Sequence, residues 1–221
     1  MPKNYISNKD ETVRMFKNNF LEALSRVHPS VPLIIYLPVI VYMLYLSIWI
    51  SQLSAINIIA LFILGSFVWT LTEYTLHRFI FHYQPKSKLG EKIHFIFHGV
   101  HHDYPSDSRR LVMPPSVSIP LALIFYFTFN AILGDIFIHT FFAGFLTGYL
   151  FYDITHYALH HFNMHSKLWL AIKNHHMKHH YQDSSKGFGV SSPLWDIFIG
   201  TNFVNRKGRE EKRLLDKDTG N

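Results

Sequence analysis

The chain has 221 residues, of which 48% are hydrophobic and 16% charged, and its formal net charge is +6. The length suits one domain, and the charged share lies well below the share of about 25% that is typical of soluble domains. The sequence contains no cysteine, which excludes disulfides, iron–sulfur clusters and thiolate metal ligands. The 16 histidines are the outlier, so metal chemistry would depend on imidazole nitrogen and carboxylate oxygen.

Residues 1–30 predict an N-terminal amphipathic arm, without the apolar core and cleavage site of a signal peptide. Apolar residues recur at helical spacing at Val13, Phe16, Phe20, Leu24 and Val27, and the opposite face holds Arg14, Asn18 and Glu22. We therefore expect an amphipathic helix that lies on the membrane surface. The alternative is a helix that packs against the protein's own soluble part.

Residues 31–221 are predicted to form one integral-membrane domain. Four apolar stretches of 17 to 20 residues lack Lys, Arg, Asp and Glu, namely Val31–Ile50, Leu53–Thr72, Ser116–Leu133 and Ile136–Tyr152. Each approaches the roughly 20 residues that cross a bilayer as a helix. Only two residues separate the members of each pair, so we expect an all-α membrane protein with four transmembrane helices in two hairpins and a cytoplasmic helical cap. Buried core helices of a soluble protein are the weaker alternative.

The basic residues predict the orientation in the membrane. All 21 Lys and Arg lie in the N-terminal arm, in Arg78–Arg110 or in Lys167–Lys217, and neither hairpin tip contains one. By the positive-inside rule, both termini and the central segment are then cytoplasmic. The net charge of +6 fits basic flanks that face anionic lipid headgroups and requires no nucleic-acid partner.

Ten histidines form four short motifs on that same side of the membrane. The motifs are His77 and His82; His98, His101 and His102; His156 and His160; and His176, His179 and His180. Positions i, i+3 and i+4 share one face of a helix, so each triplet can direct three imidazoles at one point, and the second pair can direct two. The first pair is about 140° apart on an ideal helix and needs a local bulge or a helix end.

Each pair follows a predicted hairpin and each triplet lies in the soluble segment after it, so ten imidazoles would converge from four directions. Ten neutral imidazoles are too many for one metal ion, and two ions with about five ligands each, or four plus solvent, is the natural count. A surface helix could explain one triplet, but not four such elements on one membrane face. The pattern therefore predicts a dimetal site whose ligands are these ten histidines.

Carboxylates next to these motifs are predicted to orient the ligands. Glu73 and Asp153 lie four and three residues before the first histidine of each pair, and Asp103 directly follows the first triplet. Each can accept a hydrogen bond from a ligand's second ring nitrogen and fix its tautomer. Tyr152 is placed with them around the ligands, and no residue beyond the ligands is given a catalytic role. His94 is a weaker ligand candidate, and His139, far from the motifs, is interpreted as structural.

The order of the motifs resembles that of the fatty acid hydroxylase and sterol desaturase superfamily. Closer features resemble its fatty acid 2-hydroxylase branch, namely His77–His82, the run Arg110–Pro115, Tyr152–Tyr157, and Gly187–Val190 followed by Trp195-Asp196. The resemblance spans about Thr72 to Thr201, which is well over half of the chain. It implies an O2-dependent dimetal monooxygenase that hydroxylates carbon 2 of a long acyl chain, in a fatty acid or a sphingolipid such as ceramide.

The resemblance also implies that the ten motif histidines hold two iron ions, with O2 as co-substrate. Imidazole binds zinc more tightly than ferrous iron, so we expect that zinc can occupy the sites in purified protein. Many members carry a fused cytochrome b5 domain with a His-Pro-Gly-Gly haem motif. Here His28-Pro29 is followed by Ser30-Val31, so we expect no such domain and a separate electron-donor protein of the cytochrome b5 or ferredoxin type.

Two alternatives stay open at this point. A carotenoid or sterol hydroxylase, or a desaturase, would show the same histidine pattern. A metal transporter or storage protein is a different class, but transporters place ionisable ligands near the bilayer midplane, and the predicted spans are nearly free of them. Oxygen uptake coupled to a lipid product would distinguish the enzyme from the transporter.

Overall fold

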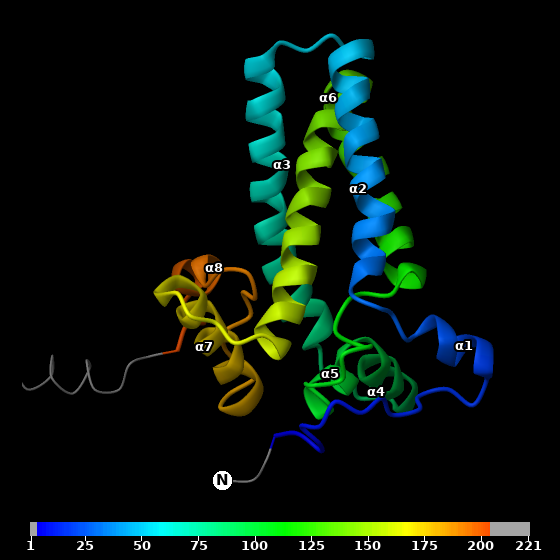
Figure 1. Ribbon diagram of the computed structural model, residues 1–221, viewed down its shortest axis with the longest axis vertical. Coiled ribbons are helices and arrows are strands. Elements are labelled where there is room, and N and C mark those ends of the chain that lie inside the picture. The colour runs from blue at the N-terminus through cyan, green and yellow to red at the C-terminus, as the bar shows by residue number, and fades with distance from the viewer. Residues whose placement is uncertain (1–3, 204–221) are drawn as a thin grey trace, which may run out of the picture.

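The computed structural model describes residues 4–203, and these contain helices and loops but no strand. Figure 1 shows long helices standing side by side and a cap of short helices at one end of them. The long helices are α2 (Ser30–Tyr45) with η1 (Leu46–Ile50), α3 (Ala55–Thr75) with η2 (Leu76–Phe81), and α6 (Pro115–His161). The cap comprises α1 (Asn19–Leu24), α4 (Lys88–His94), η3 (Phe95–Gly99), α5 (Val100–Asp103), α7 (Lys167–Tyr181) and α8 (Leu194–Ile199).

Three helices are long and apolar enough to cross a membrane, namely Ser30–Ile50, Ala55–Phe81 and Pro115–His161. In their most apolar windows only 17%, 11% and 6% of the residues are buried inside the protein. Most apolar side chains therefore face outward, where water would disfavour so large an apolar surface and lipid would cover it. The chain is a membrane protein, and the helical class predicted from its sequence is confirmed.

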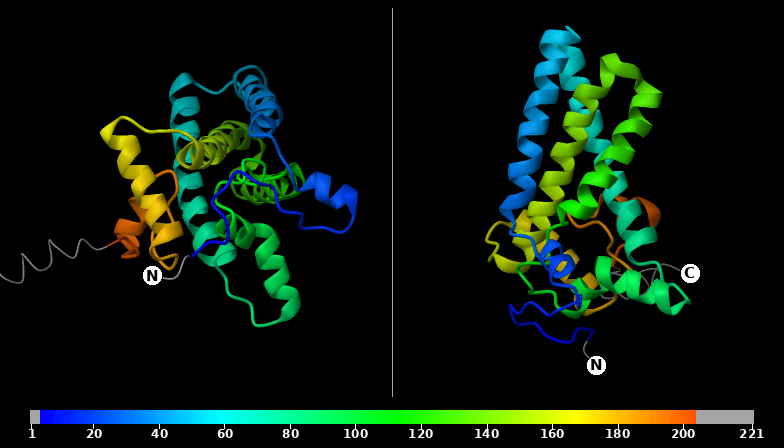
Figure 2. Two further views of the ribbon diagram at one scale, coloured as in Figure 1. Left: turned by 60° about the horizontal axis from the view of Figure 1, so that its bottom comes forward. Right: turned by 90° about the vertical axis from the view of Figure 1, so that its right-hand side faces the viewer.

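The helix α6 consists of two antiparallel halves. Gly134 interrupts it with φ 73° and ψ 170°, a conformation that glycine adopts at little cost. Phe129 and Phe145 contact each other with ring centroids 5.1 Å apart, although a straight helix would separate them by about 24 Å. The two halves therefore fold back on one another, as the right-hand view of Figure 2 shows. That each half crosses the membrane by itself, as the sequence predicts, stays a prediction.

The long helices pack through aromatic rings and glycines. Trp69 of α3 contacts Phe145 and Tyr149 of α6, with ring centroids 5.1 Å and 5.3 Å apart. A side chain at Gly65 would collide with the carbonyl of a residue in α6, and a side chain at Gly144 would collide with one in α3. Close contact between α3 and α6 fixes the positions at which both helices enter the cap.

The N-terminal arm differs from its prediction. Among residues 4–29 only Asn19–Leu24 is α-helical, and Glu22 within it is buried with 5% of its surface exposed. The Glu22 carboxylate accepts hydrogen bonds from the backbone N–H of Met15 (3.0 Å) and Phe16 (2.9 Å) and pairs with Arg110 at 2.8 Å. The predicted long helix with an outward polar face is wrong, because this buried ion pair turns Glu22 toward the protein.

Candidate metal centre

A π-helical turn brings the first histidine pair together. At η2 the backbone N–H of His82 donates to the carbonyl of His77 over 3.1 Å, across five residues. A π turn holds more residues than an α turn, so residues five apart come to lie on one side. This is the local bulge that the spacing predicts. Another π-helix, η3, contains His98 and leads directly into α5.

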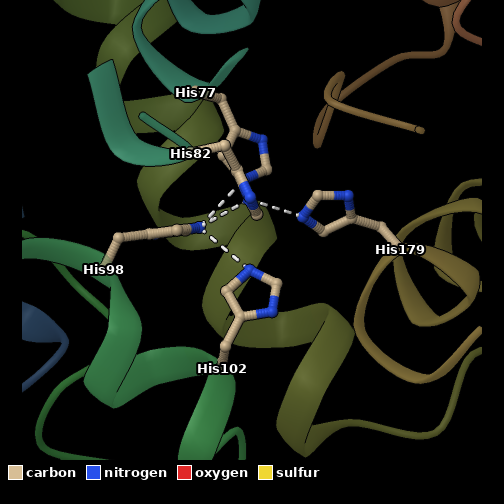
Figure 3. A group of neighbouring side chains, drawn as sticks. All are labelled: His77, His82, His98, His102 and His179. Atoms are coloured by element: carbon tan, nitrogen blue, oxygen red, sulfur yellow. Dashed lines mark hydrogen bonds between the residues drawn. The ribbon is translucent and has the colours of Figure 1, made fainter. Parts of the chain in front are cut away.

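The structure brings the ten predicted histidines together in two groups of five. The first histidine group contains His77, His82, His98, His102 and His179, and the second contains His101, His156, His160, His176 and His180. Within each group the facing ring nitrogens lie within 4.8 Å of one another. Figure 3 shows the first histidine group, whose rings come from four directions and point at one centre.

Each triplet is divided between the two groups. Its first and last histidines, four residues apart, join one group, and the histidine between them joins the other. The prediction that each triplet directs three rings at one point is therefore wrong. Neighbouring residues on a helix differ in direction by about 100°, so a helix that runs between two centres can supply both. The stacked rings of His102 and His180, with centroids 4.3 Å apart, connect the groups.

The spacing of the ring nitrogens fits the ligand shell of a metal ion. Nε2 of His98 lies 3.1 Å from Nε2 of His77, 3.1 Å from that of His82 and 3.0 Å from that of His102. A neutral ring nitrogen has either one hydrogen or one lone pair, so it makes one such hydrogen bond and not three. Nitrogens bound at about 2.1 Å to one ion, at right angles, would lie about 3.0 Å apart.

Backbone carbonyls set the tautomers of two rings in the first histidine group. Nδ1 of His77 lies 2.5 Å from the carbonyl oxygen of Phe188, and Nδ1 of His179 lies 2.6 Å from that of Lys186. A carbonyl oxygen only accepts, so both Nδ1 atoms carry the hydrogen and donate it. Each Nε2 then keeps a lone pair directed at the centre of the group, which is the form that binds a metal.

Burial lowers the pKa of the motif histidines in the cap and favours their uncharged form. It lowers the pKa of His82 to about 2, with the neighbouring His179 and His102 adding to the effect, and it lowers the pKa of His179 to about 4. Burial also holds the pKa well below the usual value at His98, His101, His102, His176 and His180. Because only the neutral imidazole is a ligand, protons compete little with a metal here at neutral pH.

The carboxylate of Glu73 does not bond to His77, contrary to the prediction. Its Oε1 accepts hydrogen bonds from the backbone N–H of Val190 (2.7 Å) and Ser191 (2.8 Å), and its Oε2 accepts one from the Ser191 hydroxyl. Spacing alone places Glu73 and His77 on one helix face, but both carboxylate oxygens are taken by donors from a distant loop.

The two other carboxylates predicted to orient the ligands do not bond to them either, whereas Tyr152 lies against a ligand as predicted. Asp153 accepts from the backbone N–H of Met113 (3.1 Å) and the hydroxyl of Tyr149 (3.2 Å) rather than from His156. The Asp103 side chain makes no hydrogen bond within residues 4–203, so its predicted bond to the first triplet is also wrong. Tyr152 stacks on His156, with ring centroids 5.8 Å apart.

Sequence analysis missed the two carbonyls that orient His77 and His179, because backbone groups leave no residue type to recognise. The available signal was the run Gly187–Val190, for which no role was assigned. His94 belongs to neither group. It lines a cavity of about 280 Å³ that also reaches His82 and His102.

A second cavity, of about 230 Å³ and mostly apolar, reaches both histidine groups from another side. It touches His98 of the first group and His101 of the second. Its walls come from four parts of the chain: the N-terminal arm with Met15, Phe16, Leu21 and Leu24; the η2 and η3 region with Phe81, Ile96 and Phe97; the segment from Arg110 to Val117; and the second half of α6 with Tyr152 and Asp153. We call this space the apolar cavity.

A helical membrane protein with two buried five-histidine groups has the features of a membrane metalloenzyme, and comparison with known proteins identifies the family. Residues 62–201 match the family described as "Fatty acid hydroxylase". The chain therefore belongs to the fatty acid hydroxylase family and is an enzyme of the oxidoreductase class. The resemblance noted in the sequence is confirmed.

Similar proteins include the dihydroceramide fatty acyl 2-hydroxylase FAH1 of Arabidopsis thaliana, 38% identical over 91% of this chain and 85% of that protein. The ceramide very long chain fatty acid hydroxylase SCS7 of Saccharomyces cerevisiae is 40% identical over 83% of this chain and 48% of its own length. This chain thus spans about half of that relative. A solved structure of full-length scs7p, with only the hydroxylase domain visible, is 39% identical, has a TM-score of 0.79 and covers 84% of this chain and 70% of its own.

Proposed function

We propose that the protein hydroxylates carbon 2 of a long acyl chain, in a fatty acid or a ceramide, by using O2 and two iron ions. The observation that carries this proposal is the apolar cavity, which reaches one histidine of each group at His98 and His101. The similar proteins named as fatty acyl 2-hydroxylases and ceramide hydroxylases support the same reaction class.

Each histidine group would hold one ion through five imidazole nitrogens. Iron supplies O2 activation and oxidation of a C–H bond when it is bound, and the protein supplies position and environment. The rings are held neutral by burial, and His77 and His179 are oriented by backbone carbonyls. The overall reaction consumes O2, two electrons and two protons, and yields the hydroxylated chain and water.

The apolar cavity would hold the part of the acyl chain that reacts. Its walls include Leu111, Val112 and Met113, which lie just before α6 enters the bundle. That place is near the boundary between the apolar helices and the polar cap, where a lipid keeps its headgroup. An acyl chain entering from this boundary would present a carbon near its carbonyl end, in agreement with attack at carbon 2.

We further propose the membrane arrangement and the partners. Residues 31–221 form one integral-membrane domain that crosses the bilayer four times, with the halves of α6 as the third and fourth crossings. The histidine groups and both termini face the cytoplasm, and residues 1–30 form an arm on that side. Residues 204–221, which include part of the basic segment Lys167–Lys217, lie outside the described residues. A separate protein of the cytochrome b5 or ferredoxin type delivers the electrons.

The test is reconstitution of the purified protein in lipid with Fe²⁺, a reductant and an electron-donor protein. A long-chain fatty acid or ceramide should gain one oxygen atom, and fragmentation in the mass spectrometer should locate the hydroxyl group on carbon 2. An oxygen on another carbon, or a new double bond without added oxygen, would contradict the proposed reaction and favour another superfamily activity.

A further inference from the structure

The loop of residues 186–191, between α7 and α8, lies against the first histidine group. Its carbonyls at Lys186 and Phe188 accept hydrogen bonds from Nδ1 of His179 and His77. Both rings belong to the first histidine group, and among the described residues the loop bonds no ring of the second. We call residues 186–191 the carbonyl loop. The position of its carbonyls decides how these two rings face the centre of their group.

Asp196 fastens the carbonyl loop from the side of α8. Its carboxylate is fully buried and accepts four hydrogen bonds. Oδ1 accepts from the Phe188 N–H at 2.9 Å and the Thr201 hydroxyl at 2.6 Å. Oδ2 accepts from the Gly189 N–H at 2.8 Å and His175 Nε2 at 3.0 Å. Two of the four donors are backbone groups of the carbonyl loop, so Asp196 fixes the peptide units that flank the Phe188 carbonyl.

Glu73 fastens the same loop from the side of α3. Its Oε1 takes the next two backbone N–H groups, those of Val190 and Ser191, over a sequence separation of 117 residues or more. Four consecutive backbone N–H groups of the carbonyl loop are thus bound by two buried carboxylates from different helices. Buried backbone donors are costly to leave unpaired, so the loop has little freedom to move its carbonyls.

We infer that Asp196 and Glu73 are positioning residues for the first histidine group, acting through the carbonyl loop. The inference rests on the proposed metal centre. It adds that the carbonyl loop orients ligands of the ion in the first group only. Partners that orient a metal-bound histidine are commonly worth 10- to 100-fold in metal affinity. Loosening the carbonyl loop should therefore weaken binding of the ion in the first group and leave the ion in the second group in place.

Two isosteric substitutions separate this role from general stability. In Asp196→Asn, the amide NH2 must face either the Phe188 N–H or the Gly189 N–H, so one loop donor loses its acceptor in both orientations. In Glu73→Gln, Oε1 still accepts from Val190 and Ser191, and the new NH2 can donate to the Ser191 hydroxyl. We therefore expect Asp196→Asn to disturb the loop and Glu73→Gln to preserve it.

The experiment measures binding of Zn²⁺ to the full chain in lipid nanodiscs, by competition with a coloured chelator. Wild-type protein and Glu73→Gln should each bind two ions tightly. Asp196→Asn should bind one ion with wild-type affinity and the other about 10- to 100-fold more weakly. Combining Asp196→Asn with His156→Ala, which damages the second group, should leave no tight site. Combining it with His82→Ala, in the first group, should leave one.

Equal weakening of both ions by Asp196→Asn, or no weakening of either, would overturn the inference while the metal centre stands. If wild-type protein binds fewer than two ions, the proposed metal centre fails first. Should Asp196→Asn fail to fold, the pair Glu73→Ala and Glu73→Gln makes the same distinction. Glu73→Ala should weaken one ion only, Glu73→Gln should restore it, and any other pattern counts against the inference.

Discussion

At the residue scale, each histidine triplet contributes ligands to both histidine groups, but the two groups contact different parts of the protein. His101 and His179 are both the middle histidine of a triplet, and they belong to different groups. His101 also touches the apolar cavity, whereas His179 is held by the carbonyl loop through Lys186. Equivalent positions in the sequence therefore have different surroundings in the folded protein.

Replacing either middle histidine should remove one ion and not two. His101→Ala should lose the ion of the second group, and His179→Ala that of the first, because each substitution removes one of five nitrogens from its own group. Hydroxylation should fall to background in both, since the proposed reaction uses both ions. Elemental analysis of purified protein checks the metal content. His139→Gln, far from either group, is the control and should keep both ions, and full metal content in all three variants would refute the assignment.

At the scale of elements, the N-terminal arm forms part of the wall of the apolar cavity, and a buried ion pair is one of the contacts that hold it there. Arg110 donates to the Glu22 carboxylate (2.8 Å), the Ser25 hydroxyl (2.7 Å) and the Val13 carbonyl (2.7 Å), so it bonds the arm at three places. Removing one charge from a group of buried charges is costly for the free energy of folding, and without Glu22 the buried Arg110 would keep only Asp107, at 3.4 Å, as a buried charged partner. The arm should therefore depend on Glu22.

The docking of the arm should depend on pH through Glu22. Burial alone would raise the pKa of Glu22, but hydrogen bonds from Phe16, Arg26 and Met15 and the charge of Arg110 lower it to about 2, from 4.5. A lowered folded-state pKa contributes stability that is present above pH 4.5 and is lost as the pH falls toward 2. A spin label at Lys17→Cys, on this cysteine-free chain, should report an ordered arm at pH 6 and a freer one near pH 3.

The matched control for the arm is Glu22→Gln, which keeps the size of the side chain and removes its charge. In this variant the spin label should already be mobile at pH 6, and its mobility should change little between pH 6 and pH 3. The substitution should also reduce turnover of a long-chain lipid several-fold without changing metal content, because it opens a wall of the cavity and leaves the histidines alone. An arm that stays ordered in Glu22→Gln would show that other contacts hold it.

At the scale of the whole molecule, polar and apolar parts are separated along the length of the protein. The cap helices lie at one end of the long helices, and the tip of each hairpin lies at the other end (Figures 1 and 2). This separation predicts the topology in the membrane. Labelling of single cysteines at Ser106 and Ser185, both in the cap, should occur only from the cytoplasmic side. A cysteine at Ser51, beside the first hairpin tip, should label only from the opposite side, and the reverse pattern would invert the proposed orientation.

The metal found in purified protein should depend on how it was made. Imidazole sites without thiolate ligands bind zinc more tightly than ferrous iron, so protein made in excess should carry zinc. Zinc has no redox chemistry, and that preparation should be inactive. Removal of zinc and loading with Fe²⁺ should restore hydroxylation in proportion to the iron bound. Full turnover by protein that contains zinc and no iron would refute the role of iron.

The long helices and the histidine motifs were predictable because their signals are local. A run of about 20 apolar residues and a spacing of four or five residues are properties of one short segment. The spacing also predicted the bulge at η2, since His77 and His82 do not share a face of an α-helix. The number of membrane crossings and the identity of the bound ions stay predictions. The ten histidines that come together were recognisable in the sequence.

The tertiary structure decided what those residues contact. It divided each triplet between two groups, directed Glu73 to the carbonyl loop rather than to His77, and turned Glu22 inward to Arg110. The partners of Glu73 and Glu22 lie up to 118 and 88 residues away in the sequence. Contacts over such separations arise only when several helices pack together. Buried polar groups must then form hydrogen bonds, and this requirement selects one partner where the spacing in the sequence allows several.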